Sequence, residues 1–185
     1  MPSLQSIIET AATHQGWVFL DEAYIEFSEQ PSLADTLLEC CDNLIILRTL
    51  SKAYGLAGIR LGYLLGSAKL ISEFVKRCAP FNIAQPTLEI AARAMSAENQ
   101  ADAKAYCQNI IVNRRHLFDW LISIKVEVLP SQANFLVLRL PEKQAGAIQS
   151  FLEKNGLLVR TFNSDNMENC LRITIPFQME ALQQL

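Results

Sequence analysis

The segment around Lys52 combines side chains that could hold a phosphate with an amine that could attack a carbonyl. Thr49 and Ser51 come just before the lysine, and Arg60 comes eight residues after it. Two hydroxyls and a guanidinium are suitable donors for a bound phosphate. A lysine beside them can form a Schiff base with an aldehyde. A lone Ser-Lys pair would indicate only a solvated loop, but the whole string R-T-L-S-K-A-Y-G-L-A-G-I-R-L-G is specific enough to predict a binding site.

A carboxylate stands at the end of another apolar run. Asp21 follows the residues 17–20, and Tyr24 comes three residues later. A carboxylate can hold a proton on a pyridine nitrogen, which makes the ring a better electron sink. Alone, the pair is equally compatible with a capping aspartate and a packing tyrosine. Because the lysine string follows about thirty residues later, the two segments together favour a site for pyridoxal phosphate (PLP).

Apolar runs predict the strands that would position these groups. Residues 17–20 and 44–47 are typical of strands buried on both faces, and 60–66 predicts a third strand. The link 51–59 is too short for a helical crossover, so the third strand should run antiparallel to the second, while the first two should be parallel. Ligand sites of open α/β sheets lie beyond the carboxyl ends of parallel strands. Asp21 and Lys52 are both expected there.

The remaining pattern predicts helices interleaved with further strands, and a change of architecture after a long helix. The expected helices span residues 2–14, 33–40, 69–78, 87–97, 101–124 and 145–155, the last closed by Gly156. The expected strands span 126–129, 135–140, 157–160 and 171–175. We therefore predict an α/β chain with three parts: residues 1–98 in a mixed, mostly parallel sheet domain, a connecting helix at 99–123, and a small α+β domain at 124–185.

Composition excludes several classes of function. The net charge is -3, which argues against nucleic-acid binding, and no apolar run is long enough to span a membrane. The first residues carry no secretory signal, which favours a cytoplasmic protein. Five cysteines without C-x-x-C spacing are expected to be reduced thiols, mostly buried. His14 and His116 have no paired ligands nearby, so no metal site is expected.

The phrases V-F-L-D-E-A-Y-I-E-F, L-R-T-L-S-K-A-Y-G-L-A-G-I-R-L-G-Y and C-L-R-I-T-I resemble the fold-type I PLP-dependent aminotransferases, in particular their histidinol-phosphate aminotransferase branch. The resemblance covers nearly the whole chain. It implies that residues 1–98 are the second part of a PLP-binding large domain and that 124–185 form the small domain. It also implies the cofactor PLP and a homodimer.

The resemblance assigns roles by position. Lys52 is the Schiff-base lysine, Asp21 the partner of the pyridine nitrogen, and Tyr24 the partner of the ring oxygen. The cofactor phosphate would be held by Thr49, Ser51 and Arg60. Arg172 matches the arginine that binds the acidic group of the substrate, and Arg160 matches a second arginine near it, although a surface role for Arg160 is equally plausible. Asn134, in a matching A-N-F phrase, is expected to support the structure.

The chain also departs from the family, whose members are about twice as long and begin with a half that has no counterpart here. That half supplies a loop for the phosphate, an aromatic ring stacked on PLP and an asparagine on the ring oxygen. We therefore expect this chain to be a fragment that ends within its last helix, at 180–185, and to be inactive by itself.

The resemblance implies amino-group transfer between L-histidinol phosphate and 2-oxoglutarate, with glutamate as the amino donor, in histidine biosynthesis. Three alternatives remain: a threonine-phosphate decarboxylase, another class I aminotransferase that acts on aromatic amino acids, and a non-catalytic remnant. A nucleotide-binding module is disfavoured, because the chain has neither G-x-G-x-x-G nor the P-loop motif.

Overall fold

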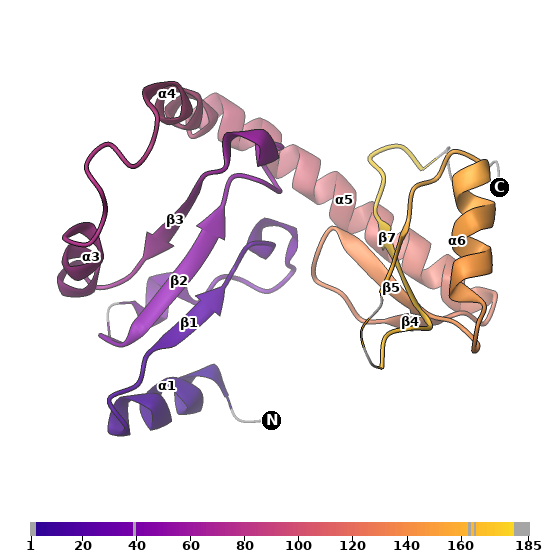
Figure 1. Cartoon of the computed structure of the whole chain (residues 1–185), viewed down its shortest axis with the longest axis horizontal. Helices are drawn as coiled ribbons and strands as arrows, with labels where there is room; N and C mark the ends of the chain where they lie inside the picture. Colours follow the sequence, from indigo (N-terminus) through magenta and orange to yellow (C-terminus); the bar gives the residue numbers. More distant parts are fainter. Residues whose placement is uncertain (1–2, 39, 163, 165, 180–185) are drawn as a thin grey trace. The chain divides into compact units, whose positions relative to one another are not determined.

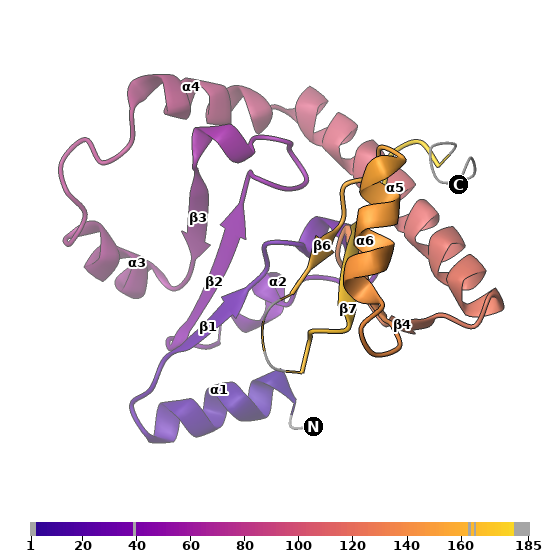
Figure 2. The same ribbon diagram turned by 45° about the vertical axis from the view of Figure 1, so that its right-hand side comes forward.

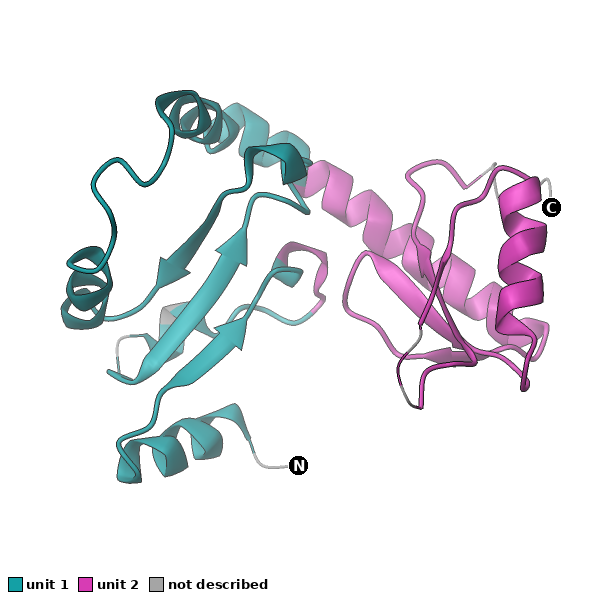
Figure 3. Ribbon diagram, in the orientation of Figure 1, with its two compact units in different colours: residues 1–25, 30–103 teal, residues 26–29, 104–185 magenta. Residues whose placement is uncertain are grey.

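A computed structural model describes residues 3–38, 40–162, 164 and 166–179. The chain divides into two compact units, shown in different colours in Figure 3. The first unit comprises residues 1–25 and 30–103, and the second comprises 26–29 and 104–185. The expected helix start at Pro2 and the expected last helix at 180–185 lie outside the described residues.

A three-stranded sheet forms the centre of the first unit (Figure 1). Its order is β1 (Val18–Asp21), β2 (Leu44–Thr49), β3 (Gly62–Leu65). β1 and β2 are parallel, whereas β2 and β3 are antiparallel. Both strand directions confirm the prediction from the lengths of the connecting segments. The carboxyl ends of β1 and β2 therefore lie at the same edge of the sheet.

Two helices cover one face of this sheet. They are α1 (Leu4–Thr13) and α2 (Ala34–Leu37). α1 begins after Ser3, whose hydroxyl accepts a hydrogen bond from the backbone N–H of Ser6 at 3.1 Å. The core between helices and sheet contains Ile8, Ala34, Leu44 and Ile46, with Val18, Leu20 and Leu65 packed against it. Because side chains alternate along a strand, the even-numbered positions of β1 and β2 face this core.

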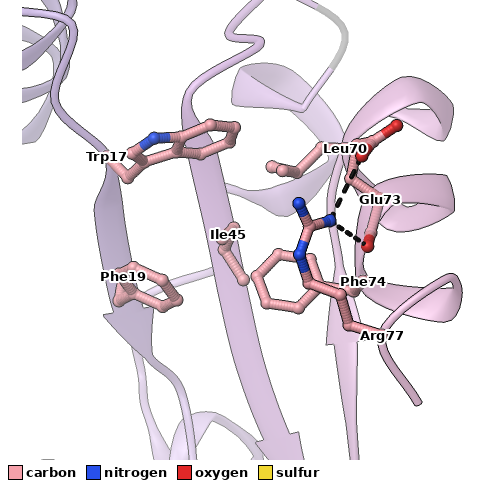
Figure 4. A pocket seen from close by; sticks show the side chains of 7 residues that line it. All are labelled: Trp17, Phe19, Ile45, Leu70, Glu73, Phe74 and Arg77. Atoms are coloured by element: carbon pink, nitrogen blue, oxygen red, sulfur yellow. Dashed lines mark hydrogen bonds and ion pairs between the residues drawn. The ribbon is translucent and has the colours of Figure 1, made fainter.

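The opposite face of the sheet has less cover, and here the prediction for β1 was wrong. Trp17 and Phe19 are 53% and 57% exposed, so β1 is not buried on both faces. Figure 4 shows both rings beside Ile45 of β2, facing α3 (Ala68–Val75). α3 covers Ile45 but leaves the two aromatic side chains of the outer strand largely open.

Two helices follow α3 in the chain, and the second of them connects the two units. α4 (Gln85–Ala94) has a proline in its first turn, and α5 (Ala97–Ser123) passes from the first unit into the second after Ala103. Both helices lie where the sequence pattern predicts them, within a few residues at each end. Among the described residues, no helix has the length and apolar character needed to span a membrane.

The second unit contains a four-stranded antiparallel sheet of order β4 (Glu127–Leu129), β5 (Phe135–Arg139), β7 (Cys170–Thr174), β6 (Arg160–Thr161). α6 (Ala145–Lys154) lies beside β6 and β7 (Figure 2). The mixed sheet of the first unit confirms the predicted α/β part, and the antiparallel sheet of the second unit with its helices confirms the predicted α+β part. Which of them correspond to the large and small domains of a complete enzyme stays a prediction.

β6 is shorter and later than predicted. Of the expected strand 157–160 only Arg160 is paired, and Leu158 is 86% exposed. The preceding backbone instead terminates α6: Gly156 has a φ of 84°, and the N–H of Leu157 donates to the carbonyl of Leu152 at 2.9 Å. Because the N–H of Leu157 is used to close α6, it is not available to a sheet.

Residues 26–29, although they precede most of the first unit in the sequence, belong to the second unit. They overlap the 3-10 helix η1 (Ile25–Phe27), and the Phe27 side chain is fully buried. The buried guanidinium of Arg114 in α5 donates to the carbonyl of Phe27 at 2.8 Å and to the carboxylate of Glu29 at 3.0 Å. Arg115 also pairs with Glu29. Removal of the Arg114 side chain would leave buried carbonyl groups without partners.

All five cysteines are free thiols. Cys107 and Cys170 are buried and Cys41 packs against the core of the first unit, as expected for most of the five, whereas Cys40 and Cys78 are exposed. Cys40 and Cys78 lie in or beside turns next to helix ends, where cover by other elements is thin. The described residues contain no group of side chains arranged to hold a metal ion.

Candidate active site

The ends of β1 and β2 place Asp21 and Thr49 on the same face of the first sheet. Asp21 is paired with Leu47 in the parallel ladder, and Thr49 lies two residues further along the same strand. Since alternate residues share a face, all three point the same way. The Asp21 side chain is exposed, and one of its carboxylate oxygens accepts the N–H of Ala23 at 2.9 Å. This bond orients the carboxylate and leaves its other oxygen available for a ligand.

A closed loop holds Lys52 next to these strand ends. The N–H of Leu50 donates to Leu61 at 3.2 Å, and the N–H of Leu56 donates back to Leu50 at 3.1 Å. Leu50 and Ala53 are buried and anchor the loop, and Gly55 turns the chain with a φ of 67°. Lys52 is therefore carried on a backbone that is fixed on both sides.

Lys52 and Tyr24 come together across the strand ends, as the sequence suggested. The Nζ atom of Lys52 lies 5.5 Å from the centre of the Tyr24 ring. Both side chains are half-buried. At this distance the ring face attracts the ammonium group. The amine and the phenol thus share one small region beside β1 and the loop after β2.

Of the residues expected to hold a phosphate, Thr49 and Ser51 are hydrogen-bonded to each other, whereas Arg60 bonds within its own turn. The hydroxyl of Thr49 accepts the N–H of Ser51 at 3.1 Å and donates to the carbonyl of Leu61 at 3.3 Å. Arg60 is exposed, and its guanidinium donates to the carbonyl of Ala57 in the 3-10 helix η2 (Ala57–Ile59) at 2.9 Å. Arg60 has a φ of 54°, a left-handed conformation that turns the chain back into β3.

Gly62 permits the close approach of β3 to the end of β2. It is the ladder partner of Thr49, and a Cβ atom at this position would lie 2.7 Å from the backbone oxygen of Arg48. Any larger residue would push the two strands apart. The glycine in R-L-G-Y therefore has a direct effect on the position of Thr49.

A buried ion pair lies on the other face of the same strand ends, and the sequence reasoning missed it. Glu22 is 7% exposed, and its Oε2 atom accepts hydrogen bonds from Nε and Nη2 of Arg48 at 3.0 and 2.8 Å. The Ser32 hydroxyl donates to both carboxylate oxygens of Glu22 at 2.9 Å. Burial opposes the charge on Arg48, but the hydrogen bonds with Glu22 and Tyr63 outweigh it, so the pKa of Arg48 is raised. Charged residues at matching positions of two adjacent strands were the available signal.

The two candidate substrate arginines lie side by side in the second unit. Arg160 of β6 is the direct ladder partner of Arg172 in β7, so both side chains project from the same face. The Arg172 guanidinium lies 4.0 Å from the centre of the Phe135 ring, and that of Arg160 lies 5.9 Å from the Phe162 ring. Neither arginine makes an ion pair with a described acidic residue. Two adjacent cations without a counter-charge are suited to an anionic ligand.

The turn before β5 supports Arg172 through Phe135. The Ser131 hydroxyl donates to the carbonyl of Phe135 at 2.6 Å and accepts the N–H of Ala133 at 3.1 Å. Asn134 bonds through its backbone to Ile175 of the segment after β7, while its buried side-chain oxygen has no partner among the described residues. Whether Asn134 has only a structural role stays a prediction.

The pocket of Figure 4 lies on the Asp21 face but nearer the start of the strands. Its volume is ≈ 320 Å³, and it is lined by Trp17, Phe19, Ile45, Leu70, Glu73, Phe74 and Arg77. The two charged side chains bond to each other, since Arg77 donates to Glu73 at 3.2 Å. The lining offers apolar surface and no reactive group, so this pocket is not the candidate active site.

Comparison with known proteins identifies the family. The whole chain, residues 1–185, matches the family described as aminotransferase class I and II. This chain therefore belongs to the class I and II aminotransferases, and its fold is that of the fold-type I PLP-dependent enzymes. The family and fold class predicted from the sequence are confirmed.

Individual relatives show which enzymes of this family the chain is similar to. A histidinol-phosphate aminotransferase from Pectobacterium atrosepticum is 40% identical over 175 residues, which cover 93% of this chain and 48% of the relative. The crystal structure of histidinol-phosphate aminotransferase from Sinorhizobium meliloti in complex with pyridoxal-5'-phosphate is 26% identical with a TM-score of 0.76, covering 95% of this chain and 50% of that one. A decarboxylase from Sulfurospirillum multivorans is 25% identical with a TM-score of 0.81, covering 98% and 49%. The chain spans about half the length of the relatives it matches.

Proposed function

We propose that the protein containing this chain is a PLP-dependent aminotransferase that transfers an amino group between L-histidinol phosphate and 2-oxoglutarate, in histidine biosynthesis. The observation that carries the proposal is the arrangement at the ends of β1 and β2, where Lys52 lies 5.5 Å from the Tyr24 ring. Asp21 and Thr49 share the adjoining sheet face. Membership of the aminotransferase family and relatives with this activity support the choice of reaction.

The side chains of the first unit fit the cofactor. Asp21 presents a free carboxylate oxygen for the pyridine nitrogen, and Tyr24 a phenol for the ring oxygen. Thr49, Ser51 and Arg60 supply two hydroxyls and a guanidinium for the phosphate. When bound, PLP supplies an electron sink for charge at the substrate carbon.

Lys52 is the residue proposed to carry out the proton transfer. Its amine would hold the cofactor covalently, and as a free amine its Nζ would accept a proton from the substrate carbon and return it. The closed loop from Leu50 to Leu61 keeps the backbone of Lys52 in place during this exchange. Asp21 would accept a hydrogen bond from the ring nitrogen and so favour the protonated ring, the better electron sink.

Arg172 and Arg160 are proposed to bind the acidic end of each substrate in turn. A phosphate monoester and a dicarboxylate both offer oxygens to two guanidiniums, and planar guanidiniums bind such groups in bidentate fashion. The stacking of Arg172 on Phe135 fixes the direction of its donors before the substrate arrives. The adjacent pair in the ladder explains how one site could accept both anions.

Borohydride labelling tests the assignment of the lysine. Protein from the complete reading frame that contains this sequence is mixed with PLP, reduced with borohydride and mapped by mass spectrometry. The pyridoxyl group should be found on Lys52, and Lys52→Ala should abolish both labelling and transamination. Lys69→Ala, a change at an exposed lysine of α3, serves as the control and should retain both. A label on another lysine would refute the assignment.

Decarboxylation of threonine phosphate is a second candidate, because the decarboxylase from Sulfurospirillum multivorans shares the fold at a TM-score of 0.81. The same two arginines would bind its phosphate, so the anion site does not separate the two reactions. The two reactions are distinguished by assays with histidinol phosphate plus 2-oxoglutarate and with threonine phosphate. Release of carbon dioxide from threonine phosphate, without amino transfer to 2-oxoglutarate, would overturn the first choice.

We further infer that the 185 residues alone are inactive, that the complete enzyme is a homodimer and that it acts in the cytoplasm. The inference of inactivity is supported by the share of the relatives' length that the chain covers, 48% in the first comparison. Equilibrium dialysis of the 185-residue chain against PLP, with a glutamate half-reaction, provides the test. Tight stoichiometric binding with normal turnover would contradict it.

A further inference from the structure

Two consecutive acids at the end of β1 point to opposite faces of the first sheet. Asp21 lies on the face that carries Thr49, whereas Glu22 is buried on the other face with Arg48. Arg48 and Thr49 divide in the same way, and Tyr63, the ladder partner of Arg48, lies on the Glu22 face. Each strand end therefore carries one residue for the candidate cofactor site and, next to it, one residue of a buried ion pair.

The buried pair connects three separate segments of the chain. Arg48 approaches one oxygen of Glu22 through two nitrogens, at 3.0 and 2.8 Å, and also donates to the Ser32 oxygen at 2.8 Å. The Ser32 oxygen in turn accepts the N–H of Ala34, which begins α2. The side chains of Arg48 and Glu22 are 20% and 6% exposed, so water competes little with these bonds.

We propose that the Glu22–Arg48 pair, together with Ser32, positions Asp21 and Thr49 for the cofactor. The proposal rests on the proposed function of the site. Beyond Asp21 the backbone of β1 keeps one ladder bond to β2, from the N–H of Glu22 to the carbonyl of Leu47 at 2.9 Å. The ion pair adds a side-chain connection at that point. It fixes the end of β1 against the end of β2, and with it the separation between the Asp21 carboxylate and the Thr49 hydroxyl.

A purely structural role is the alternative, and epistasis distinguishes the two. If Glu22 acts through Asp21, loss of the Glu22 charge should change the protonation of the cofactor's ring nitrogen only while residue 21 is a carboxylate. Asp21→Asn keeps the oxygen that accepts the Ala23 N–H and removes the charge. Glu22→Gln should then change the cofactor's titration in the Asp21 background and leave it unchanged in the Asn background.

The measurements are PLP affinity and the pH midpoint of the bound cofactor's absorbance, both made on protein from the complete reading frame. Glu22→Gln should weaken PLP binding by about tenfold, the change expected from one lost hydrogen bond of ordinary strength. The pH midpoint should rise by about one unit, because without a well-placed carboxylate the ring nitrogen loses its proton and the Lys52 nitrogen keeps its own to higher pH. Ser32→Ala should shift both quantities in the same direction by less.

Two further variants guard against loss of folding. Glu22→Gln with Arg48→Met removes both charges, so no unpaired charge stays buried, and it should still show the shifted midpoint. Ile8→Val, in the core on the same face, lowers stability without touching the pair and should leave the midpoint unchanged.

The outcomes separate the two proposals. If the wild type takes no PLP at Lys52, the proposed function fails, and the positioning role falls with it. If the wild type binds PLP and Asp21→Asn shifts the midpoint but Glu22→Gln and the double variant do not, the proposed function stands and the positioning role is wrong. An equal shift from Glu22→Gln in both backgrounds also overturns it.

Discussion

Removal of Arg160 should stabilise the protein without ligand and weaken its binding of anions. Arg160 and Arg172 are direct ladder partners, so their Cβ atoms are about 5 Å apart and their charges repel. With the guanidiniums about 6 Å apart and an effective dielectric constant of about 40–80, suited to one exposed and one half-buried side chain, the repulsion is about 0.7–1.4 kcal/mol. Screening by salt at physiological ionic strength reduces this value by about half, to about 0.3–0.8 kcal/mol.

The assay is thermal unfolding of Arg160→Gln beside the wild type, with and without inorganic phosphate. For a chain of this length we expect a rise of about 1–3 °C in Tm without phosphate, and a smaller rise at high salt. Phosphate should raise the Tm of the wild type more than that of the variant, because it binds the folded state through both arginines.

Arg139→Gln is the matched control on the same sheet. Arg139 faces Glu127 across β4 and β5 and donates to its carboxylate at 2.8 Å, so this arginine has an opposite charge as its partner. Its removal should lower Tm slightly or leave it unchanged, and should leave the phosphate effect intact. If Arg160→Gln destabilises the ligand-free protein as Arg139→Gln does, or if phosphate stabilises all three proteins equally, the reasoning about paired cations is wrong.

Three other predictions concern packing and titration. Gly62→Ala should destabilise by about 1–3 kcal/mol and weaken PLP binding, because its Cβ would lie 2.7 Å from the Arg48 oxygen; urea unfolding that matches the wild type would contradict this. Burial and the nearby Glu26 raise the pKa of the Cys107 thiol from 9.0 to about 11. The stabilisation from the buried neutral thiol is therefore present below pH 9 and falls by up to about 2–3 kcal/mol towards pH 11. In Cys107→Ala, the free energy of unfolding should decrease less between about pH 9 and pH 11 than in the wild type. In native protein at pH 8 a thiol reagent should modify Cys40 and Cys78 and spare Cys107, and equal rates would refute the burial pattern.

Local signals were enough to predict the strands and the loop with Lys52. The apolar runs at 17–20 and 44–47 and the short link at 51–59 fixed the strand directions, because a chain of nine residues has no room for a helical crossover. The same segments placed Asp21 and Lys52 at neighbouring strand ends. Chemistry that depends on residues close in the chain is visible without a structure.

Interactions across strands were harder to predict, since they depend on register. The pairing of Glu22 with Arg48 and the stacking of Arg172 on Phe135 both require the ladder to be known residue by residue. The exposure of Phe19 depends on which elements cover the sheet, and an apolar run gives no information on that. The predicted bounds of β6 were wrong for a related reason, because Leu157 closes the end of α6 instead of beginning a strand.

The contribution of residues 26–29 to the second unit has a consequence for the order of assembly. Arg114 binds the carbonyl of Phe27, 87 positions earlier in the chain, so during synthesis this segment leaves the ribosome long before its partner does. Until α5 is complete, the Phe27 side chain cannot be buried as it is in the folded protein, and the segment after Tyr24 remains accessible to chaperones and proteases. A protease cut inside α5 would likewise fail to release two self-sufficient halves, because the carboxyl-terminal piece would lack residues 26–29 and with them the buried Phe27.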